Sequence, residues 1–400
     1  MEFAAGRVMA ASAVCLALLV AYWLAERIAL TRRRGAVPLR ICVTGTRGKS
    51  SVVRLLVSVL RAAGYKVLAK TTGSKPVLIL PDGAEREIAR PGRPSILEQK
   101  RVLGLAARLG ADAVVAEMMS IRGENLRAES GAIFRPRILA VTNVRLDHLD
   151  DMGRTKDEIA ATMAAAVPGG GATFVLEEES YPAFADAARE RGGTLVCVPK
   201  ADAVPSPPTA PEAGEFPENV WLTSAIAGSL GIAPGVIAAG IAAARPDFGA
   251  LRVWKVPSPP GAGGRALVVA SAFAANEPES SARVLDALRR RHPGLPSKTV
   301  ALLNLRADRG DRTEQWLAAL RDGFFASFEK VVFMGDHARV LGRTKRTRPS
   351  LAAVADRDPA RIMARLGALT GEGCLVVGLG NIGGAGAALV DYWMRTGEAL

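Results

Sequence analysis

The fold is decided by Leu39-Arg40-Ile41-Cys42-Val43-Thr44-Gly45-Thr46-Arg47-Gly48-Lys49-Ser50-Ser51. A short apolar run is followed by a glycine-containing turn and then by a helical pattern. The apolar residues of that pattern fall on one side of the expected helix: Val52, Val53, Leu55, Leu56, Val59 and Leu60. The stretch therefore predicts a strand, a loop and a helix, in which the loop N–H groups and the start of the helix can hold phosphate.

The loop residues have the chemistry of a phosphate site. Gly45 and Gly48 let the backbone approach a ligand, the ammonium group of Lys49 can reach β- and γ-phosphates, and the hydroxyl of Ser50 can bind Mg²⁺. The spacing differs from that of the usual P-loop, which would need glycine at Val43. The alternative is a glycine turn that only caps the helix.

Polar residues also follow the next two predicted strands. Glu117 ends the apolar run 113–116, and Asp147-His148 follows the run 138–141 after Thr142-Asn143. The carboxyl ends of parallel strands form the edge at which open α/β sheets bind ligands. Carboxylate and imidazole groups are metal ligands, so these two strand ends bring candidate ligands to the phosphate loop.

Composition limits the classes of protein that fit. The chain has 400 residues, of which 49% are hydrophobic and 23% charged, and this predicts two or three packed domains. The net charge of +13 fits an acidic lipid, an acidic substrate or a nucleic acid. However, only 5% of residues are aromatic and none alternate with basic residues, so we expect no nucleic-acid partner. The four cysteines lie far apart, which argues against a CxxC metal pair and favours reduced thiols.

The N-terminus predicts a membrane anchor. No charge interrupts the run from Val8 to Ala25, which would form a helix of roughly 27 Å, near the thickness of the hydrocarbon layer. Arg7 precedes the run, whereas five arginines follow it: Arg27, Arg32, Arg33, Arg34 and Arg40. The positive-inside tendency places that basic side, and the rest of the chain, in the cytoplasm. A cleaved signal peptide is the alternative, but no A-x-A-type cleavage site follows the run.

Two segments rich in proline or glycine divide the rest of the chain. The segment 205–217 reads as a surface loop, and a second Pro/Gly cluster at 257–264 closely follows Arg245-Pro246. Further strand candidates lie at 266–270, 299–305, 331–334 and 374–377. We therefore predict a membrane anchor with a basic flank at 1–34, a central ATP-binding domain at 35–245 and a smaller C-terminal domain at 246–400. The expected fold class is α/β, with a parallel sheet in the central domain and a Rossmann-like C-terminal domain.

The motifs resemble those of a known superfamily. The loop 45–50, the strand-terminal Glu117 and the sequence from Thr142 to Gly153 are similar to the ATP-binding central domain of the Mur ligases. Four segments resemble, more narrowly, the ligase subunits of poly-γ-glutamate synthases, the PgsB/CapB family: Gly48 to Ser51, Thr72 to Ser74, Arg93 to Gln99 and Thr142 to His148. The match is dense over residues 40–160 and thinner afterwards.

The resemblance implies an amide ligase. A substrate carboxylate would attack the γ-phosphate of ATP, and the amine of an incoming glutamate would attack the resulting acyl phosphate. Lys49 would neutralise charge, and Mg²⁺ would be held by Ser50, Glu117 and His148. The residues expected around the nucleotide are Gly45, Thr46, Arg47, Gly48, Lys49, Ser50, Ser51, Asn143, Asp147 and Asn276. The implied partners are glutamate, the growing poly-γ-glutamate chain, small membrane-embedded and surface-anchored synthase subunits, the membrane and further copies of the chain.

The C-terminal half matches the superfamily less well. Arg245 occupies the hinge position at which Mur-type ligases place an arginine on the nucleotide phosphates when the domains close; the alternative is a surface arginine before a turn. Asn276 and Pro278 hold their places in a segment like the superfamily's Asp-Tyr-Ala-His-Asn-Pro, but Ala272 and Ala275 replace its acid and histidine. No lysine occurs between Lys156 and Lys200, so none is assigned to the carbamylated position that many Mur ligases use.

Two motifs have no assigned role. The run from Gly378 to Gly384 looks like a dinucleotide fingerprint but lacks its acidic partner, so a tight turn is the favoured interpretation. The charged residues between Asp308 and Arg312 would either meet an acidic chain or lie on a solvated loop. Two other functions also stay open: a Mur-type ligase for another acid and amine, and a P-loop ATPase subunit of a polymer export complex.

Overall fold

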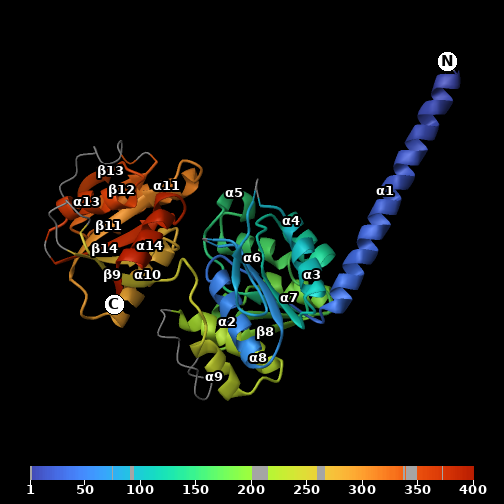
Figure 1. Ribbon diagram of the computed structural model, residues 1–400, viewed down its shortest axis with the longest axis horizontal. Helices are drawn as coiled ribbons and strands as arrows, with labels where there is room; N and C mark the ends of the chain where they lie inside the picture. The colour runs from blue at the N-terminus through green and yellow to red at the C-terminus, as the bar shows by residue number, and fades with distance from the viewer. Residues whose placement is uncertain are drawn as a thin grey trace.

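The computed structural model describes residues 2–73, 75–90, 94–200, 215–258, 266–336, 338, 349–371 and 373–400. They form two α/β units that lie side by side, and a long N-terminal helix extends from the first unit, away from the second (Figure 1). The predicted fold class is confirmed.

The first unit is built on an eight-stranded sheet of order β4-β3-β2-β5-β1-β6-β7-β8. Its strands are β1 (Leu39–Thr44), β2 (Val67–Thr71), β3 (Val77–Ile79), β4 (Glu85–Glu87), β5 (Ala113–Glu117), β6 (Ile138–Val141), β7 (Ala172–Leu176) and β8 (Thr194–Val198). The strands from β2 to β8 in this order pair in parallel, whereas β3 and β4 add an antiparallel edge. The three strand predictions at 39–44, 113–116 and 138–141 are confirmed.

Helices cover both faces of this sheet. They are α2 (Lys49–Ala62), α3 (Glu98–Arg108), α4 (Gly123–Arg127), α5 (Leu149–Met152), α6 (Lys156–Ala164), α7 (Pro182–Glu190), α8 (Pro217–Ser229) and α9 (Pro234–Ala242), with a π-helix at Ala128–Phe134 and a 3-10 turn at Glu177–Glu179. Helix α2 is buried between two layers, since Val53 and Leu56 pack towards the sheet and Leu55 and Val59 pack beneath α8 and α9. This burial fixes the loop that precedes α2.

The second unit has a seven-stranded sheet of order β13-β12-β11-β14-β10-β9-β15. Its elements are β9 (Arg252–Val256), β10 (Leu267–Ser271), α10 (Pro278–Arg291), β11 (Lys298–Leu305), α11 (Gly310–Arg321), β12 (Lys330–Gly335), β13 (Ser350–Val354), α13 (Pro359–Leu369), β14 (Cys374–Gly380), α14 (Ala385–Thr396) and β15 (Glu398–Ala399). Strands β13 to β10 in this order are parallel, while β9 and β15 are antiparallel. The chain passes from the first unit to the second between Ala242 and Arg252. Most of the predicted loop 205–217 and of the cluster 257–264 lies outside the described residues.

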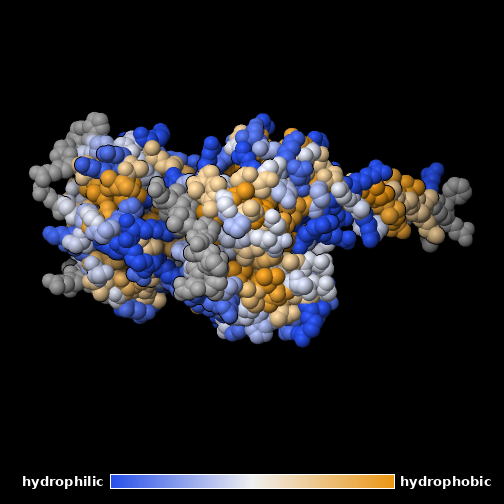
Figure 2. Space-filling view, turned by 90° about the horizontal axis from the view of Figure 1, so that it is seen from below, coloured by the Kyte–Doolittle hydropathy of each residue, from blue (hydrophilic) through white to orange (hydrophobic). Residues whose placement is uncertain are grey.

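Helix α1 (Glu2–Ala36) has two parts. Among the described residues, Met9–Ala36 is the one helical segment long and apolar enough to cross a membrane, and it is almost entirely unburied. Its apolar side chains and the hydrophilic residues at its base are visible in Figure 2. The last turns belong to the first unit: Leu30 joins the core, Glu26 pairs with Lys100 at 2.5 Å, and Arg34 donates to the carbonyl of Ala132 at 2.9 Å. Part of the basic flank is therefore structural.

Candidate functional site

A cavity of about 1110 Å³ lies between the two units. The first unit lines it with the phosphate loop, the end of β5 and the segment after β6. The second unit lines it with the segment before α10, one side of α10, the β11–α11 turn and the β14–α14 turn. Every residue predicted for the nucleotide or metal contributes to this lining except Arg245.

The loop between β1 and α2 needs its glycines. Gly45 has φ +125°, and a Cβ there would lie 2.1 Å from Oγ1 of Thr142. Gly48 has φ +79°, and a Cβ there would lie 2.6 Å from Oδ1 of Asn219. A side chain is excluded at both positions, so the backbone remains open to a ligand at the start of α2.

The segment after β6 clamps this loop. Oδ1 of Asn143 accepts the N–H of Arg47 at 3.0 Å, and its amide nitrogen donates to the carbonyl of Arg47 at 3.1 Å. The N–H of Thr46 donates to the carbonyl of Asn143 at 3.0 Å. Asn143, predicted to shape the site around the nucleotide, is thus placed to set the loop conformation.

Lys49 folds back over the loop. Its Nζ donates to the carbonyls of Gly45 at 2.7 Å and Thr46 at 3.2 Å. Burial lowers the pKa of Lys49, while Glu117 opposes that shift. The ammonium group is therefore held over the loop, where Lys49 lines the cavity.

Ser50 and Glu117 meet at the carboxyl edge of the sheet. Oε2 of Glu117 accepts the hydroxyl of Ser50 at 2.7 Å and the N–H of Thr72 at 2.7 Å. A hydroxyl and a carboxylate are the hard oxygen donors that Mg²⁺ and Mn²⁺ favour. The described residues contain no cluster of three His, Cys, Asp or Glu that could hold a metal by itself. The pair fits a cation that takes its other ligands from phosphate and water.

His148 faces the same cavity from the segment after β6. It has φ +50°, a left-handed conformation that is uncommon for residues other than glycine, and its Nε2 lies 3.9 Å from Oδ2 of Asp147. Burial lowers the pKa of His148, against the opposing charge of Asp147. A neutral imidazole keeps a nitrogen lone pair for a metal, so the predicted role of His148 is compatible with its position.

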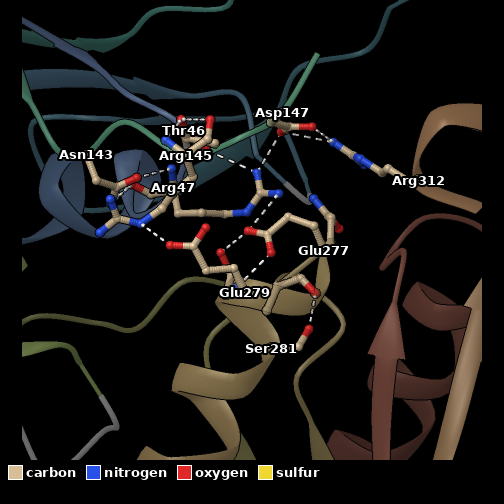
Figure 3. Close-up of polar contacts among 12 residues, drawn as sticks. Thr46, Arg47, Asn143, Arg145, Asp147, Glu277, Glu279, Ser281 and Arg312 are labelled. Atoms are coloured by element: carbon tan, nitrogen blue, oxygen red, sulfur yellow. Dashed lines mark hydrogen bonds and ion pairs between the residues drawn. The ribbon is translucent and has the colours of Figure 1, made fainter. Parts of the chain in front are cut away.

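Asp147 is the most heavily paired acid in the site. Oδ2 accepts Nη1 of Arg47 at 2.8 Å, and Nη2 of Arg312, from the second unit, donates to Oδ1 at 3.2 Å and to Oδ2 at 3.3 Å (Figure 3). Burial opposes ionisation of Asp147, but the two arginines outweigh it and hold its pKa well below the usual range. Asp147 therefore remains a carboxylate that joins the phosphate loop to the second unit.

Further ion pairs hold the two units together. Glu279 lies 3.7 Å from Nε of Arg145 and 3.2 Å from Nζ of Lys156, and Glu277 lies 3.7 Å from Nη2 of Arg47. Arg145 is also paired with the buried Glu179, in the first unit. None of these pairings was predicted from the sequence.

The wall beside the start of α2 is formed by the segment that enters α8. Oε1 of Glu215 accepts the side-chain amide of Asn219 at 2.5 Å and the N–H of Phe216 at 3.0 Å. The guanidinium carbon of Arg291, on α10, lies 5.5 Å from the centre of the Phe216 ring. Burial raises the pKa of Glu215.

The predictions for the hinge and for α11 have different outcomes. Arg245 is exposed and lies outside the cavity, so its role on phosphates stays a prediction for a more closed arrangement. Asn276 lies in the cavity, with its amide oriented to donate to the carbonyls of Phe273 at 3.1 Å and Gly380 at 3.2 Å.

The solvated-loop interpretation is wrong for Arg312, which is buried in the first turn of α11. Ser74 and Arg93, two residues of the resemblance, lie outside the described residues.

Comparison with known families divides the chain as the two sheets do. The Mur ligase middle domain matches residues 43–197, and the poly-gamma-glutamate synthase CapB C-terminal domain matches residues 258–396. The chain is similar to PGA synthase CapB of Bacillus subtilis (strain 168), with 33% identity over 284 residues that cover 70% of this chain and 71% of the relative. It is also similar to capsule biosynthesis protein CapB of Bacillus anthracis, with 28% identity over 398 residues that cover 96% and 82%.

Solved structures share the whole architecture. A bifunctional folylpolyglutamate synthase/dihydrofolate synthase with Mn, AMPPNP and L-glutamate bound has a TM-score of 0.63 and 16% identity, over 92% of this chain and 93% of that one. A second structure of this kind, from Yersinia pestis with AMPPNP and a Mn ion, has a TM-score of 0.61 and 15% identity over the same shares. At these identities the similarity establishes the fold.

Proposed function

The chain belongs to the CapB family of Mur-type ligases, and on that premise we propose that it is an ATP-dependent ligase that polymerises glutamate into poly-γ-glutamate. One observation carries the proposal: Lys49, the Ser50–Glu117 pair and His148 converge on one cavity between a P-loop unit and a second α/β unit. The descriptions of the matching C-terminal family and of the B. subtilis relative name the same product.

The chemistry has two steps. A carboxylate oxygen attacks the terminal phosphorus of ATP, the bond from that phosphorus to ADP breaks, and an acyl phosphate forms. The amine nitrogen of an incoming glutamate then attacks the acyl carbon, the carbon–oxygen bond to phosphate breaks, and a proton leaves as the amide forms. Negative charge develops in both steps, and Lys49 and the N–H groups of the loop are placed to neutralise it.

The donor set at the strand edge fits a divalent cation. Ser50, Glu117 and His148 would hold it, and when bound it would neutralise charge between the terminal phosphates. The position of Glu117 supports this role, because its Oε2 already binds both the hydroxyl of Ser50 and the backbone of Thr72.

The proposed location is the cell membrane, with α1 as a single span and both α/β units in the cytoplasm, where ATP is available. The unburied apolar length of α1 and the arginines that follow it support this orientation. The proposed partners are glutamate, the growing acidic chain, small membrane-embedded and surface-anchored synthase subunits, and further copies of this chain.

The test measures glutamate-dependent ADP release and labelled γ-polymer in membranes that also contain the proposed membrane subunits. Wild type is compared with Lys49→Ala and with Lys66→Ala, an exposed lysine in the turn between α2 and β2. We expect Lys49→Ala to reduce both signals by about a hundredfold or more, and Lys66→Ala to retain them.

Other results would select another function. ADP release without any amide product would favour an ATPase subunit of an export complex. Turnover only with other acids or amines would favour a Mur-type ligase of different specificity. Polymer formation that persists in Lys49→Ala would contradict the proposed site.

A further inference from the structure

Arg312 is a buried arginine held across the boundary between the two units. It lies in the first turn of α11 and is 6% exposed. Its Nη2 donates to both oxygens of Asp147, in the first unit, and its Nη1 donates to Oδ1 of Asn381 at 3.0 Å. Because Nη1 and Nη2 are both hydrogen-bonded, the guanidinium is held in one orientation. Its third nitrogen, Nε, is left to donate to a ligand.

The glycine-rich turn after β14 supplies one of those ends. The structure confirms a tight turn, with Gly380 at φ +86° and so close to β11 that a Cβ would lie 2.5 Å from the carbonyl of Asn304. The amide of Asn304 donates to the carbonyl of Gly383 at 3.0 Å. Asn381 is thereby buried at 3% exposure with its side chain against Arg312. The motif that resembled a dinucleotide fingerprint thus positions an arginine.

Arg47 approaches the same carboxylate from the opposite side. Its guanidinium lies between Asp147 and Glu277, while Arg312 reaches Asp147 from the second unit (Figure 3). Two arginines, one from each unit, therefore share the carboxylate of Asp147.

Three guanidinium nitrogens in this group make no hydrogen bond to any described residue, although Nη2 of Arg47 lies 3.7 Å from Glu277. Nε and Nη2 of Arg47 and Nε of Arg312 are buried and have no hydrogen-bond partner within the described ranges. A buried donor without a partner destabilises the protein, and more so when the donor is charged. Arginine donors match the oxygens of carboxylates and phosphates, which would satisfy them.

We propose that Arg47 and Arg312 form an oxyanion site that bridges the two units, with Asp147 and Asn381 as the residues that position it. The ligand is an anionic oxygen group of a reactant, either the terminal phosphate of the nucleotide or a carboxylate of the amino-acid substrate; the second source rests on the proposed function. Because each unit contributes one arginine, the bound anion stabilises the arrangement in which the units face each other.

The test uses the purified full-length protein in lipid nanodiscs. Dissociation constants are measured for ADP, for AMPPNP, and for D- and L-glutamate added to the AMPPNP-loaded protein. The variants are Arg312→Gln, Arg312→Lys, which keeps the charge but loses the planar fork, and Asn381→Ala. Arg321→Gln, an exposed arginine at the end of α11, is the matched control, and melting curves identify any variant that fails to fold.

Two outcomes support the site and distinguish its ligand. If Arg312 binds the terminal phosphate, Arg312→Gln weakens AMPPNP binding by about tenfold to a hundredfold and leaves ADP binding unchanged. If Arg312 binds the carboxylate, both nucleotides bind normally and glutamate binding weakens by that factor. In either case Asn381→Ala weakens the same ligand by a smaller factor, and Arg312→Lys recovers only part of the loss.

Two other outcomes overturn it. In one, all constants stay within about twofold of the Arg321→Gln control; in the other, ADP and AMPPNP weaken together, which indicates a general disturbance of the loop. Failure of the proposed function is a separate result, in which wild type releases no ADP in response to glutamate. The comparison of ADP with AMPPNP would still decide whether Arg312 binds the terminal phosphate. The direct glutamate titration would still decide whether it binds the carboxylate.

Discussion

At the scale of single residues, the absence of a side chain at Gly73 leaves space for the hydroxyl of Ser50. A Cβ at Gly73 would lie 2.5 Å from Oγ of Ser50. The serine can turn away at small cost to the fold, but its hydroxyl would then leave Glu117. We expect Gly73→Ala to raise the Mg²⁺ or Mn²⁺ concentration that gives half-maximal ADP release by about tenfold or more, with little change in melting temperature.

Gly228→Ala is the matched control for that substitution. Gly228 lies in α8, and a Cβ at this position would have no neighbouring atom within 4 Å, so the added methyl group meets nothing. A Gly73→Ala protein with an unchanged cation titration would show that the hydroxyl of Ser50 does not serve the metal.

Glu215 makes stability depend on pH. Burial raises its pKa above the ordinary value of 4.5, so the folded state holds the proton more tightly than the unfolded state. As pH rises from about 4.5 to the raised pKa, the unfolded chain loses this proton first, and the free energy of unfolding falls. Glu215→Gln keeps an oxygen for Phe216 and Asn219 and removes this proton.

We therefore expect the melting temperature of Glu215→Gln, relative to wild type, to rise across that pH window and then to level off. The measurement is a series of melting curves between pH 4 and pH 8. Glu190→Gln, which removes an exposed carboxylate at the end of α7, controls for the lost charge. A difference that stays flat with pH would contradict the shift in Glu215.

At the scale of elements, α1 is one helix whose apolar part is exposed and whose last turns pack on the first unit. Leu30 is 8% exposed and packs in the core of the first unit, whereas Ile28, two residues earlier, is 51% exposed. We expect Leu30→Ala to lower the free energy of unfolding by about 2–4 kcal/mol and Ile28→Ala to change it by less than about 0.5 kcal/mol. Denaturant unfolding in a mild detergent measures both, and equal effects would contradict the docking of α1.

An element could be predicted where the residues that determine it lie close together in the chain. The strand–loop–helix at 39–62 follows from a period of apolar residues and two glycines, and parallel strands must bring Glu117 and His148 to the same edge. The antiparallel β15 was missed, since it pairs with β9, which lies far from it in the chain. The end of the anchor was placed at residue 34, but the helix continues to Ala36 and packs on the first unit.

The site was largely predictable in its first unit, whereas in its second unit only Asn276 was predicted. Lys49 and Ser50 belong to a local motif, whereas Arg312 lies 165 residues from Asp147, and no pattern near either residue indicates the pair. Asn381 was hidden in a motif that resembled a different one. Arg245 was placed by analogy with a hinge; it is exposed and outside the cavity, so its role stays a prediction.

At the scale of the whole molecule, only two residues separate α1 from β1, the strand that carries the phosphate loop. The contacts of Glu26 and Arg34 with the first unit make this connection stiff. An inserted α1 would therefore hold the ligase cavity at a set orientation to the membrane rather than on a flexible tether. Such a placement suits the proposed transfer of an acidic chain to membrane partners.

The cysteines of the chain offer a direct test of that orientation. Cys197, at the end of β8, is exposed, Cys42 and Cys374 are buried, and Cys15 lies within the apolar part of α1. If both α/β units are cytoplasmic, a membrane-impermeant maleimide labels Cys197 in inverted vesicles and leaves it unlabelled in intact cells. Cys197→Ser should abolish the signal in the vesicles, which identifies its source. Labelling of Cys197 in intact cells would place the units outside, away from ATP, and would remove the basis for the proposed location.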